Sequence, residues 1–504
     1  MPLQKHHHKP KSWLNIAGLA CLISFSVIPH PASADTSFSL FSSLSKIYRL
    51  YIEGRCHEHI RSAYVCGLMY AHGITVPKDY ERAHYWYDQA ITYDNTNEAA
   101  FDSLLTLNQT YHRGIQDKYA LHRYYYEKGV AQGDTTSMIE LANLYEEGLG
   151  GPKDISAALH LREKAAELHD ATGMALLGRM YMYGSGVPQN AASANALFEA
   201  SAKQGNIFGQ YFLGNSYLFG DGVAENDLKA MELYQKAADQ DSPAAKYRIG
   251  YIYAYSKQLS HDYKKSLKWL LKAADEDEPR SFSLLTLLYD KGLGTSPDPQ
   301  KSQQWADRAV QQNGPSAFCD IADRYQPDPT GTYDYKRAVY WYEAAAAKNE
   351  QCAYPSLGNF YFLGQGVMRD FRKAKYWYDK INNNNDVAAL NNLGEIYNYG
   401  YGGVPQDLQK ARSLYEKCIQ QDDEICMYNL GNLYEFGRGV PQNYQTARYW
   451  YEKSAQKHES SAEAHLASFY ETGKAGLPQD PAMAQSLYKQ ACHDGDTPSC
   501  DHIK

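Results

Sequence analysis

Apolar residues recur along this chain at helical spacing in short blocks, and glycine-rich breaks separate neighbouring blocks. In residues 424–460, Leu430 and Tyr434 share one face of a first helix. Two glycines and a proline interrupt that helix over 437–443. A second amphipathic helix follows over 446–456, with alanine and aromatic residues on its apolar side. The pattern predicts a helix–loop–helix unit.

This unit repeats along most of the chain, and a tyrosine marks its register. Tyr434 and Tyr470 continue a regular series after a one-residue slip, and Tyr70 and Tyr111 precede it less regularly. A fixed period of this length indicates one supersecondary unit stacked many times. We therefore predict an all-α fold, a right-handed superhelical αα solenoid of about twelve antiparallel helix pairs over residues 62–496. The regular register tyrosines, each 36 residues from the next, are Tyr145, Tyr181, Tyr217, Tyr253, Tyr289, Tyr325, Tyr361 and Tyr397.

The positions around each register tyrosine predict how the helices pack. A glycine or alanine stands three residues before it in most units. Glycine inside a helix costs about 1 kcal/mol relative to alanine, so close packing of the second helix must offset that cost. Three units depart from the pattern: residues 98–134 have a shortened loop, and the glycine pair is absent at 255–257 and 326–329. We interpret these loops as bends or specialised edges of the stack.

The motif as a whole resembles the Sel1-like repeat, a longer-looped relative of the tetratricopeptide repeat. The stretch from Leu357 to Tyr378 carries nearly all of it: Leu-Gly, the register tyrosine, Gly-x-Gly-Val, an aspartate and Lys-Ala-x-x-Trp-Tyr. The resemblance implies a scaffold that binds other proteins, with the first helices of the units lining a concave groove. Exported bacterial members of this family are associated with envelope assembly, signalling complexes and host contact.

The two ends of the chain carry no repeat. Residues 1–34 contain three lysines, an apolar run over 13–28 and a terminal Ala-Ser-Ala, which together predict a cleaved signal peptide. Residues 35–61 have apolar residues at helical spacing and are predicted to cap the open end of the stack. Residues 497–504 form a short C-terminal tail. We therefore expect a periplasmic or secreted protein.

Charge and hydropathy narrow the range of partners. Removing the three lysines of the signal peptide, which has no acidic residue, changes the net charge from −8 to −11. No long Lys/Arg run offers a basic face, so nucleic acid is not an expected partner. No second apolar run is long enough to span a bilayer. With 45 tyrosines against 15 phenylalanines, the core of the repeats is predicted to be tyrosine-rich. We expect a monomeric solenoid whose acidic, tyrosine-rich groove suits a peptide or a basic protein surface.

Eight cysteines remain after cleavage, an even number that is expected to pair in an oxidising compartment. Two of the predicted pairs have the same eight-residue spacing at the junction of two units, which suits a staple across a tight turn. A third could tie the N-terminal helix to the first unit, and the fourth joins the first helices of adjacent units. The alternative is buried free thiols. In that order the pairs are Cys418 with Cys426, Cys492 with Cys500, Cys56 with Cys66, and Cys319 with Cys352.

Candidate partner-binding residues follow from the same register. By analogy with tetratricopeptide arrays, the residue two before the register tyrosine points toward the groove, where an amide offers both a donor and an acceptor to a peptide backbone. Aromatic anchors beside these amides would complete a binding surface. The alternative is asparagines bonded within their own repeats and aromatic rings packed between repeats. The predicted residues are Asn143, Asn215, Asn359, Asn432, Tyr211, Tyr251 and Phe362.

The sequence contains few motifs for catalysis or metal binding, and those present are incomplete. The stretches 43–46 and 454–457 fit the Ser-x-x-Lys of penicillin-interacting enzymes, but no Ser-Asp-Asn or Lys-Thr-Gly accompanies them. His57 and His59 are two residues apart and would lie on different faces of a helix. We predict no enzyme, catalytic residue, metal or cofactor. The favoured function is a protein–protein interaction scaffold with a peptide or protein in its groove; the alternative is a peptidoglycan- or β-lactam-interacting protein.

Overall fold

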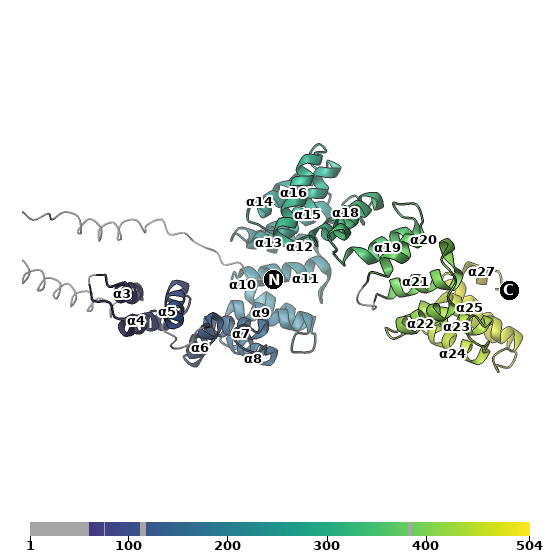
Figure 1. The fold of residues 1–504 in the computed structure, drawn as a ribbon, viewed down its shortest axis with the longest axis horizontal. Coiled ribbons are helices and arrows are strands. Elements are labelled where there is room, and N and C mark those ends of the chain that lie inside the picture. The colour runs from purple at the N-terminus through teal and green to yellow at the C-terminus, as the bar shows by residue number, and fades with distance from the viewer. Residues whose placement is uncertain (1–59, 75, 111–116, 382–385, 504) are drawn as a thin grey trace, which may run out of the picture. The chain divides into compact units, whose positions relative to one another are not determined.

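The computed structural model describes residues 60–503 except 75, 111–116 and 382–385. The described part is helical throughout and contains no strand, which confirms the predicted all-α fold class. The chain forms two compact units, 1–197 and 198–504, which divide within one helix (Figure 1). The predicted signal peptide and residues 35–59 of the predicted cap lie outside the described residues.

Helices follow one another in pairs through both units. The first unit contains α3 (Ile60–His72), α4 (Tyr80–Tyr93), α5 (Glu98–Thr110), α6 (Lys118–Ala131), α7 (Thr135–Glu147), α8 (Ile155–Glu167) and α9 (Ala171–Tyr183), and the division falls in α10 (Ala191–Lys203). The second unit contains α11 (Ile207–Phe219), α12 (Asp227–Ala238), α13 (Pro243–Tyr255), α14 (Tyr263–Asp275), α15 (Pro279–Lys291), α16 (Pro299–Asn313), α17 (Ala317–Asp323), α18 (Tyr335–Ala347), α19 (Ala353–Leu363) and α20 (Phe371–Tyr378). It continues with α21 (Val387–Tyr399), the 3-10 turn η1 (Tyr401–Gly403), α22 (Leu408–Ile419), α23 (Glu424–Phe436), α24 (Tyr444–Ala455), α25 (Ser460–Thr472), α26 (Pro481–His493) and α27 (Thr497–Cys500).

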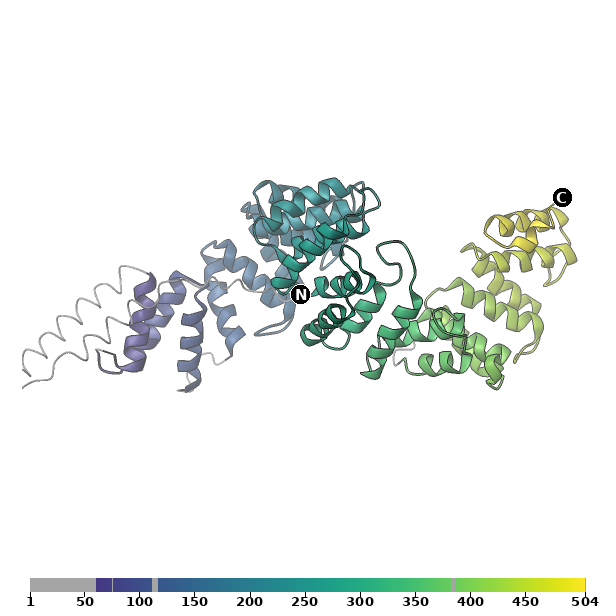
Figure 2. The same cartoon turned by 90° about the horizontal axis from the view of Figure 1, so that it is seen from above.

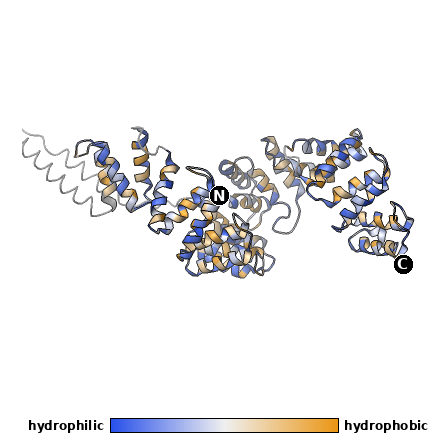
Figure 3. Ribbon diagram, turned by 90° about the horizontal axis from the view of Figure 1, so that it is seen from below, coloured by the Kyte–Doolittle hydropathy of each residue, from blue (hydrophilic) through white to orange (hydrophobic). Residues whose placement is uncertain are grey.

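Glycine lets the two helices of a pair approach closely. A Cβ atom on Gly431 would lie 2.7 Å from Cε1 of Tyr451, and one on Gly214 would lie 2.7 Å from Cε1 of Tyr234. Both tyrosines are fully buried. The small residue three before the register tyrosine therefore makes room for an aromatic ring of the second helix. Along the helices, apolar and polar residues alternate, as expected for amphipathic helices (Figure 3).

The loop between the two helices is closed by the same hydrogen bonds in most repeats. The first helix ends at a glycine three residues after the register tyrosine, as at Gly364 with φ 76°. The second helix begins at an N-cap aspartate or asparagine, whose N–H bonds the register carbonyl, as from Asp370 to Tyr361 at 2.8 Å. The period is thus fixed by local contacts, and successive pairs of the second unit lie side by side (Figure 2).

The residue seven before the register tyrosine, here called the stacking position, faces the second helix of its own repeat. In three repeats it is aromatic and stacks on a tryptophan at centroid distances of 5.6–5.8 Å. It is methionine or leucine in several others. The pairs are Phe282 with Trp305, Phe318 with Trp341, and Tyr354 with Trp377. An apolar side chain is therefore the common solution at this position.

None of the described helices is both long enough and apolar enough to cross a membrane. The segment 98–134, which has the shortened loop, forms the helix pair α5 and α6. The first residues of the C-terminal tail form the short helix α27.

Candidate functional site

A pocket of about 580 Å³ lies in the second unit, where α13, α15 and α17 run beside one another. These are the first helices of three repeats, the helices expected to present a binding surface. The pocket mixes aromatic rings with charged groups of both signs. Its lining residues are Tyr251, Tyr255, Lys257, Pro279, Arg280, Ser283, Asn313, Asp320, Asp323, Arg324 and Pro327.

The loop after α13 borders the pocket and replaces the usual glycine turn. Ser256 stands where other repeats have the left-handed glycine, and its φ is −56°. Its hydroxyl donates to the buried carboxylate of Asp227 and accepts the N–H of Leu259 at 2.8 Å. These buried hydrogen bonds hold the loop in a backbone conformation that differs from the glycine turn of the other repeats. Tyr255 and Lys257, on either side of Ser256, both line the pocket.

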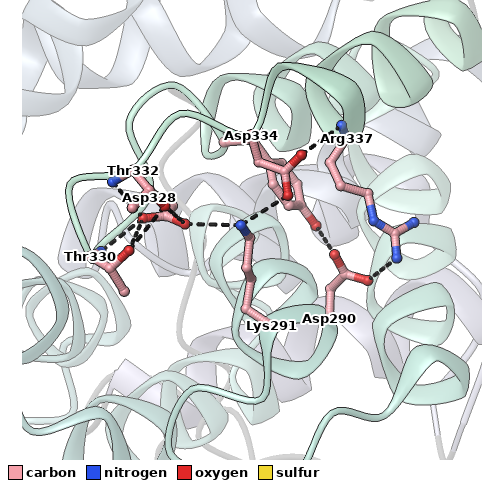
Figure 4. A network of polar contacts seen from close by, with 8 residues as sticks. Asp290, Lys291, Asp328, Thr330, Thr332, Asp334 and Arg337 are labelled. Carbon is pink, nitrogen blue, oxygen red and sulfur yellow. Dashed lines mark hydrogen bonds and ion pairs between the residues drawn. The ribbon is translucent and has the colours of Figure 1, made fainter. Parts of the chain in front are cut away.

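The loop after α17 also replaces the glycine and is held by the polar network of Figure 4. Asp328, at the glycine position, is 2% exposed, and its carboxylate accepts the N–H groups of Thr330 at 2.9 Å and Thr332 at 3.1 Å. Nζ of Lys291, on α15, lies 3.1 Å from Asp328 and 2.9 Å from Asp334. Burial alone would raise the pKa of Asp328, but these threonine and lysine contacts outweigh it and lower the pKa below its ordinary value.

Three further hydrogen bonds connect the helices and loops around this network. Asp290 accepts from Arg337 at 2.7 Å and from the hydroxyl of Tyr325 at 2.9 Å, which joins α15 to the register tyrosine of the next repeat (Figure 4). The hydroxyl of Tyr263 donates to the carbonyl of Pro329 at 3.2 Å, so the two irregular loops are connected to each other. The pocket therefore has rigid walls on the side where the repeat motif is broken.

Arginines are the principal charged groups of the site. Arg324 donates to the hydroxyl of Tyr247 at 3.1 Å and to Oγ of Ser283 at 3.3 Å, and no carboxylate within the described residues forms an ion pair with it. Arg280 pairs with Glu278 at 2.7 Å through Nε, while its Nη1 donates to the hydroxyl of Tyr211 at 3.0 Å. Guanidinium groups held by phenols and hydroxyls keep most of their capacity to bind a carboxylate.

Arg248, on α13 beside this cluster, likewise forms no ion pair with a carboxylate of the described residues. It lies over the ring of Phe219, 5.0 Å from the centroid, and its buried Nε has no hydrogen-bond partner in the part of the chain that the structure describes. Burial alone would raise the pKa of the Tyr211 hydroxyl, yet the charges of Arg280 and Arg248 outweigh burial and lower it. The charges of these two arginines therefore dominate the surroundings of the Tyr211 hydroxyl, at the edge of a pocket that also contains Asp320 and Asp323.

Of the predicted partner-binding residues, Tyr251 lines the pocket and Tyr211 bonds Arg280 at its edge. Asn143, Asn215 and Asn359 each accept a hydrogen bond from the second helix of their own repeat, from Arg162 at 3.1 Å, Tyr234 at 2.8 Å and Tyr378 at 2.7 Å. The amide of Asn432 lies 3.5 Å from the hydroxyl of Tyr428, and Phe362 packs edge-on against Phe371. These contacts orient the amides within the repeats, and contact with a partner stays a prediction.

Sequence reasoning did not single out Arg280, Arg324 or Asp323. Arg280 and Arg324 stand at different distances from the register tyrosine in two repeats, so no period reveals them. Asp323 does occupy the position two before its register tyrosine, Tyr325, which was expected to face the groove. The available signal was the pair of broken loops at 255–257 and 326–329, which were identified as specialised edges and do border the pocket.

Three of the four predicted cysteine pairs are joined as disulfides in the structure. Cys418–Cys426 and Cys492–Cys500 each link a second helix to the first helix of the following unit. Cys319–Cys352 links the first helices of adjacent repeats. Cys56 lies outside the described residues.

The described Ser-x-x-Lys segment is poorly placed for nucleophilic chemistry. Ser454 is fully buried, and its hydroxyl donates to the carbonyl of Glu424 at 2.7 Å. Lys457 forms an ion pair with Asp422 at 2.6 Å. A buried hydroxyl that already donates to the backbone is not available to attack a β-lactam. Residues 43–46 lie outside the described residues.

These helix pairs with a fixed register and a polar surface on the first helices define an α-helical repeat protein of the interaction-scaffold class. The family model for the Sel1 repeat matches eleven segments that cover most of the chain, and the chain belongs to the Sel1 repeat family. The segment 98–134, counted above as a twelfth unit, is not matched. The matched residues are 60–92, 135–170, 171–206, 207–242, 243–278, 287–314, 325–350, 356–386, 387–423, 425–458 and 460–496.

Solved structures with a similar fold come from several bacteria. A protective antigen present in uropathogenic Escherichia coli strains is 24% identical, with 90% of this chain and 88% of that chain covered and a TM-score of 0.38. A Sel1 repeat protein from Oxalobacter formigenes is 25% identical, with coverages of 68% and 89% and a TM-score of 0.38. The Pseudomonas aeruginosa immunity protein Pa5087 is 21% identical, with coverages of 43% and 77% and a TM-score of 0.31. No curated protein matches the chain.

Proposed function

We propose that this protein is an exported, non-catalytic scaffold that binds an extended peptide segment of a partner across α13, α15 and α17. A carboxylate of that segment enters the pocket lined by Arg280, Arg324, Tyr251 and Tyr255. Membership of the Sel1 repeat family supports a scaffold, since proteins of this family bind other proteins. The predicted signal peptide and the three disulfides support an oxidising compartment outside the cytoplasm.

The observation that favours a carboxylate ligand is that the hydrogen-bond partners of Arg324 are uncharged. Its guanidinium donates to Tyr247 and Ser283, both neutral, in a pocket that other side chains leave open. Arginine presents several N–H donors in a plane, and a carboxylate accepts two of them at once. Tyr251 and Tyr255 lie stacked at 4.7 Å beside it and offer an apolar surface to the residue that bears the carboxylate.

The acidic side chains of the pocket set the specificity. The Asp323 carboxylate accepts the hydroxyl of Tyr342, and Asp320 lies one helical turn before it. These groups favour a partner N–H or ammonium next to the carboxylate and disfavour a run of several acidic residues. The proposed ligand is therefore a peptide with one carboxylate, either a side chain or a free C-terminus, rather than a polyacidic segment.

The test uses random peptide libraries synthesised with free and with amidated C-termini. Enrichment by the wild-type chain of peptides with a free C-terminus or a single Asp or Glu, lost in Arg324→Gln, would support the proposal. The matched control is Arg308→Gln, an exposed arginine paired with Asp277 on the outer helix α16. Retained enrichment in Arg324→Gln but loss when Asn143, Asn215, Asn359 and Asn432 are all changed to Ala would instead assign binding to the asparagines.

A further inference from the structure

The stacking position of the last matched repeat is occupied by a carboxylate. Glu463 stands seven residues before Tyr470, where most other repeats have an apolar residue. It is 0% exposed. Gln490 donates to its Oε1 at 2.6 Å, while its Oε2 has no hydrogen-bond partner within the described residues. Burial of a carboxylate with one oxygen that accepts no hydrogen bond lowers the stability of the fold, unless a positive group compensates the charge.

Two other ligand-type groups converge on this carboxylate. His458 comes from the turn between α24 and α25, and Asp494 ends α26. Their ligand atoms and a Glu463 oxygen all lie within 4.8 Å of one another. Nδ1 of His458 is 3.1 Å from Asp494, and the side chains of these two residues are 73% and 16% exposed, so the cluster is open to solvent on one side.

An equivalent cluster in another repeat shows what the last one lacks. Asp241, Lys246 and Glu276 occupy the same turn, stacking and helix-end positions one repeat after α11. There Nζ of Lys246, whose side chain is 8% exposed, lies 3.2 Å from Asp241 and 2.5 Å from Glu276. The chain supplies a cation at the centre and two carboxylates around it.

A neutral version of the same cluster occurs one repeat earlier. Gln210 is at the stacking position, and Nε2 of Gln240 bonds its Oε1 at 3.0 Å. These side chains satisfy each other without any charge. In the last repeat the central group and the helix-end group are both anionic. Among the described residues, the basic groups that contact them are two exposed histidines on Asp494: His458 at 3.1 Å and His493 at 2.8 Å. The missing partner is a cation in the place of the Lys246 ammonium.

We propose that His458, Glu463 and Asp494 bind a divalent transition-metal ion of the Zn²⁺ class, with water completing the coordination. One imidazole and two carboxylates are a donor set that zinc accepts. Ligand atoms in a tetrahedral zinc site are ~3.3 Å apart, given metal–ligand distances of ~2.0–2.1 Å. Nδ1 of His458 already lies 3.1 Å from Asp494, and the whole group spans at most 4.8 Å. The ion would fasten α25 to α26 at the C-terminal end of the array. This inference does not depend on the proposed peptide pocket.

The test is isothermal titration of the full, metal-free chain with zinc chloride, with the disulfides intact so that no thiol competes. The wild type should bind one more equivalent of zinc than Glu463→Lys, which places an ammonium where Lys246 has one. His458→Ala should weaken that site by more than about tenfold, because even loss of a residue that merely supports a ligand costs about 10- to 100-fold. Substitution of His160, an exposed histidine on α8, is the matched control and should change nothing.

The melting temperature provides a second readout. Zinc should raise it in the wild type and not in Glu463→Lys, and the zinc-free lysine variant should melt no lower than the zinc-free wild type. His458 is exposed, so His458→Ala keeps the test valid if the lysine variant fails to fold. Equal zinc stoichiometry and affinity in the wild type and both variants would overturn the proposal.

Discussion

Two arginine clusters of this protein are compensated differently. On α7, α8 and α9, Arg162 is fully buried and lies 2.5 Å from Glu146, and Arg179 approaches the same carboxylate at 2.9 Å. At the pocket of α13, α15 and α17, Arg324 has only Tyr247 and Ser283 as neutral acceptors. The first cluster carries its own counter-ion, while in the second, by our proposal, a ligand carboxylate takes that place.

The difference separates structural from binding arginines. A buried guanidinium with a carboxylate in the chain contributes when both partners are present and is costly when one is removed. A guanidinium held by phenols beside open space adds little to stability and retains its affinity for an anion. Residue type and repeat position alone do not distinguish the two; the partners do.

The largest expected effect is on the paired cluster. Glu146→Ala leaves two guanidinium groups, one of them fully buried, without a carboxylate. Removal of one partner from a buried pair costs about 3–5 kcal/mol, and since Glu146 is partly exposed we expect about 3 kcal/mol. Urea unfolding followed by circular dichroism measures it, and an unchanged transition would show that the cluster is not a structural ion pair.

Substitution of Arg324 in the pocket should change ligand affinity more than stability. Arg324→Gln should weaken binding of a carboxylate-bearing peptide about tenfold or more, because a charge-assisted hydrogen bond contributes roughly 1.5–3 kcal/mol. Its free energy of unfolding should fall by about 1.5 kcal/mol, the lower end of the range for hydrogen bonds of a charged group, because the pocket leaves this guanidinium partly open to water. Fluorescence anisotropy and urea unfolding give the two numbers, with Arg308→Gln as control; a large loss of stability with unchanged affinity would reverse the assignment.

The irregular loop after α17, which borders the pocket, is expected to affect both the stability of the protein and its affinity for a peptide. Asp328→Ala removes the acceptor for Thr330, Thr332 and Lys291, so we expect a loss of about 2 kcal/mol in stability. Peptide affinity should also fall several-fold, because the pocket wall is no longer fixed. Asp328→Asn keeps one oxygen as acceptor for the backbone N–H groups and should lose less. Equal behaviour of both variants would contradict the role given to the carboxylate.

Acid should weaken the paired cluster. Burial by itself would raise the pKa of Glu146, but Arg162 and Arg179 outweigh burial and lower it below its ordinary value. A carboxyl with a lowered folded-state pKa adds stability above its unfolded pKa, about 4.5, and that contribution disappears as pH falls through the folded pKa. Glu146→Gln should therefore be less stable than wild type at pH 7 but approach it below about pH 4. A constant difference across this range would argue against the ion pair.

The smallest effect is expected for the more exposed partner of Glu146. The side chain of Arg179 is 34% exposed, and Arg162 alone still compensates the carboxylate when Arg179 is removed. Arg179→Ala should therefore cost less than about 1 kcal/mol, as exposed ion pairs do. A loss as large as that of Glu146→Ala would mean that the two arginines act as one unit.

The fold could be predicted from the sequence because the period depends on local contacts. The register tyrosine, the glycine three residues later and the N-cap aspartate interact within one loop, as at Tyr361, Gly364 and Asp370. The pocket could not be predicted in the same way. Its arginines come from separate repeats at different positions, and only the broken loops pointed to the region.

The asparagine prediction shows a related limit. The position two before the register tyrosine is also within reach of a tyrosine on the second helix, and Asn215 and Asn359 accept hydrogen bonds from Tyr234 and Tyr378. The same holds for the zinc cluster, whose members are separated by 5 and 31 residues and fit no ligand motif. The signal in the sequence was Glu463, a carboxylate at a position that is apolar in most repeats.

The most direct test of the carboxylate-binding pocket is a paired titration. A peptide selected by the wild-type chain would be compared with its version in which the carboxylate is replaced by an amide, against both wild type and Arg324→Gln. The account predicts that the amide weakens binding about tenfold or more to the wild type and much less to the variant, since the two changes remove the same contact. Equal losses in both proteins, or selection of basic peptides as the net negative charge alone would favour, would contradict it.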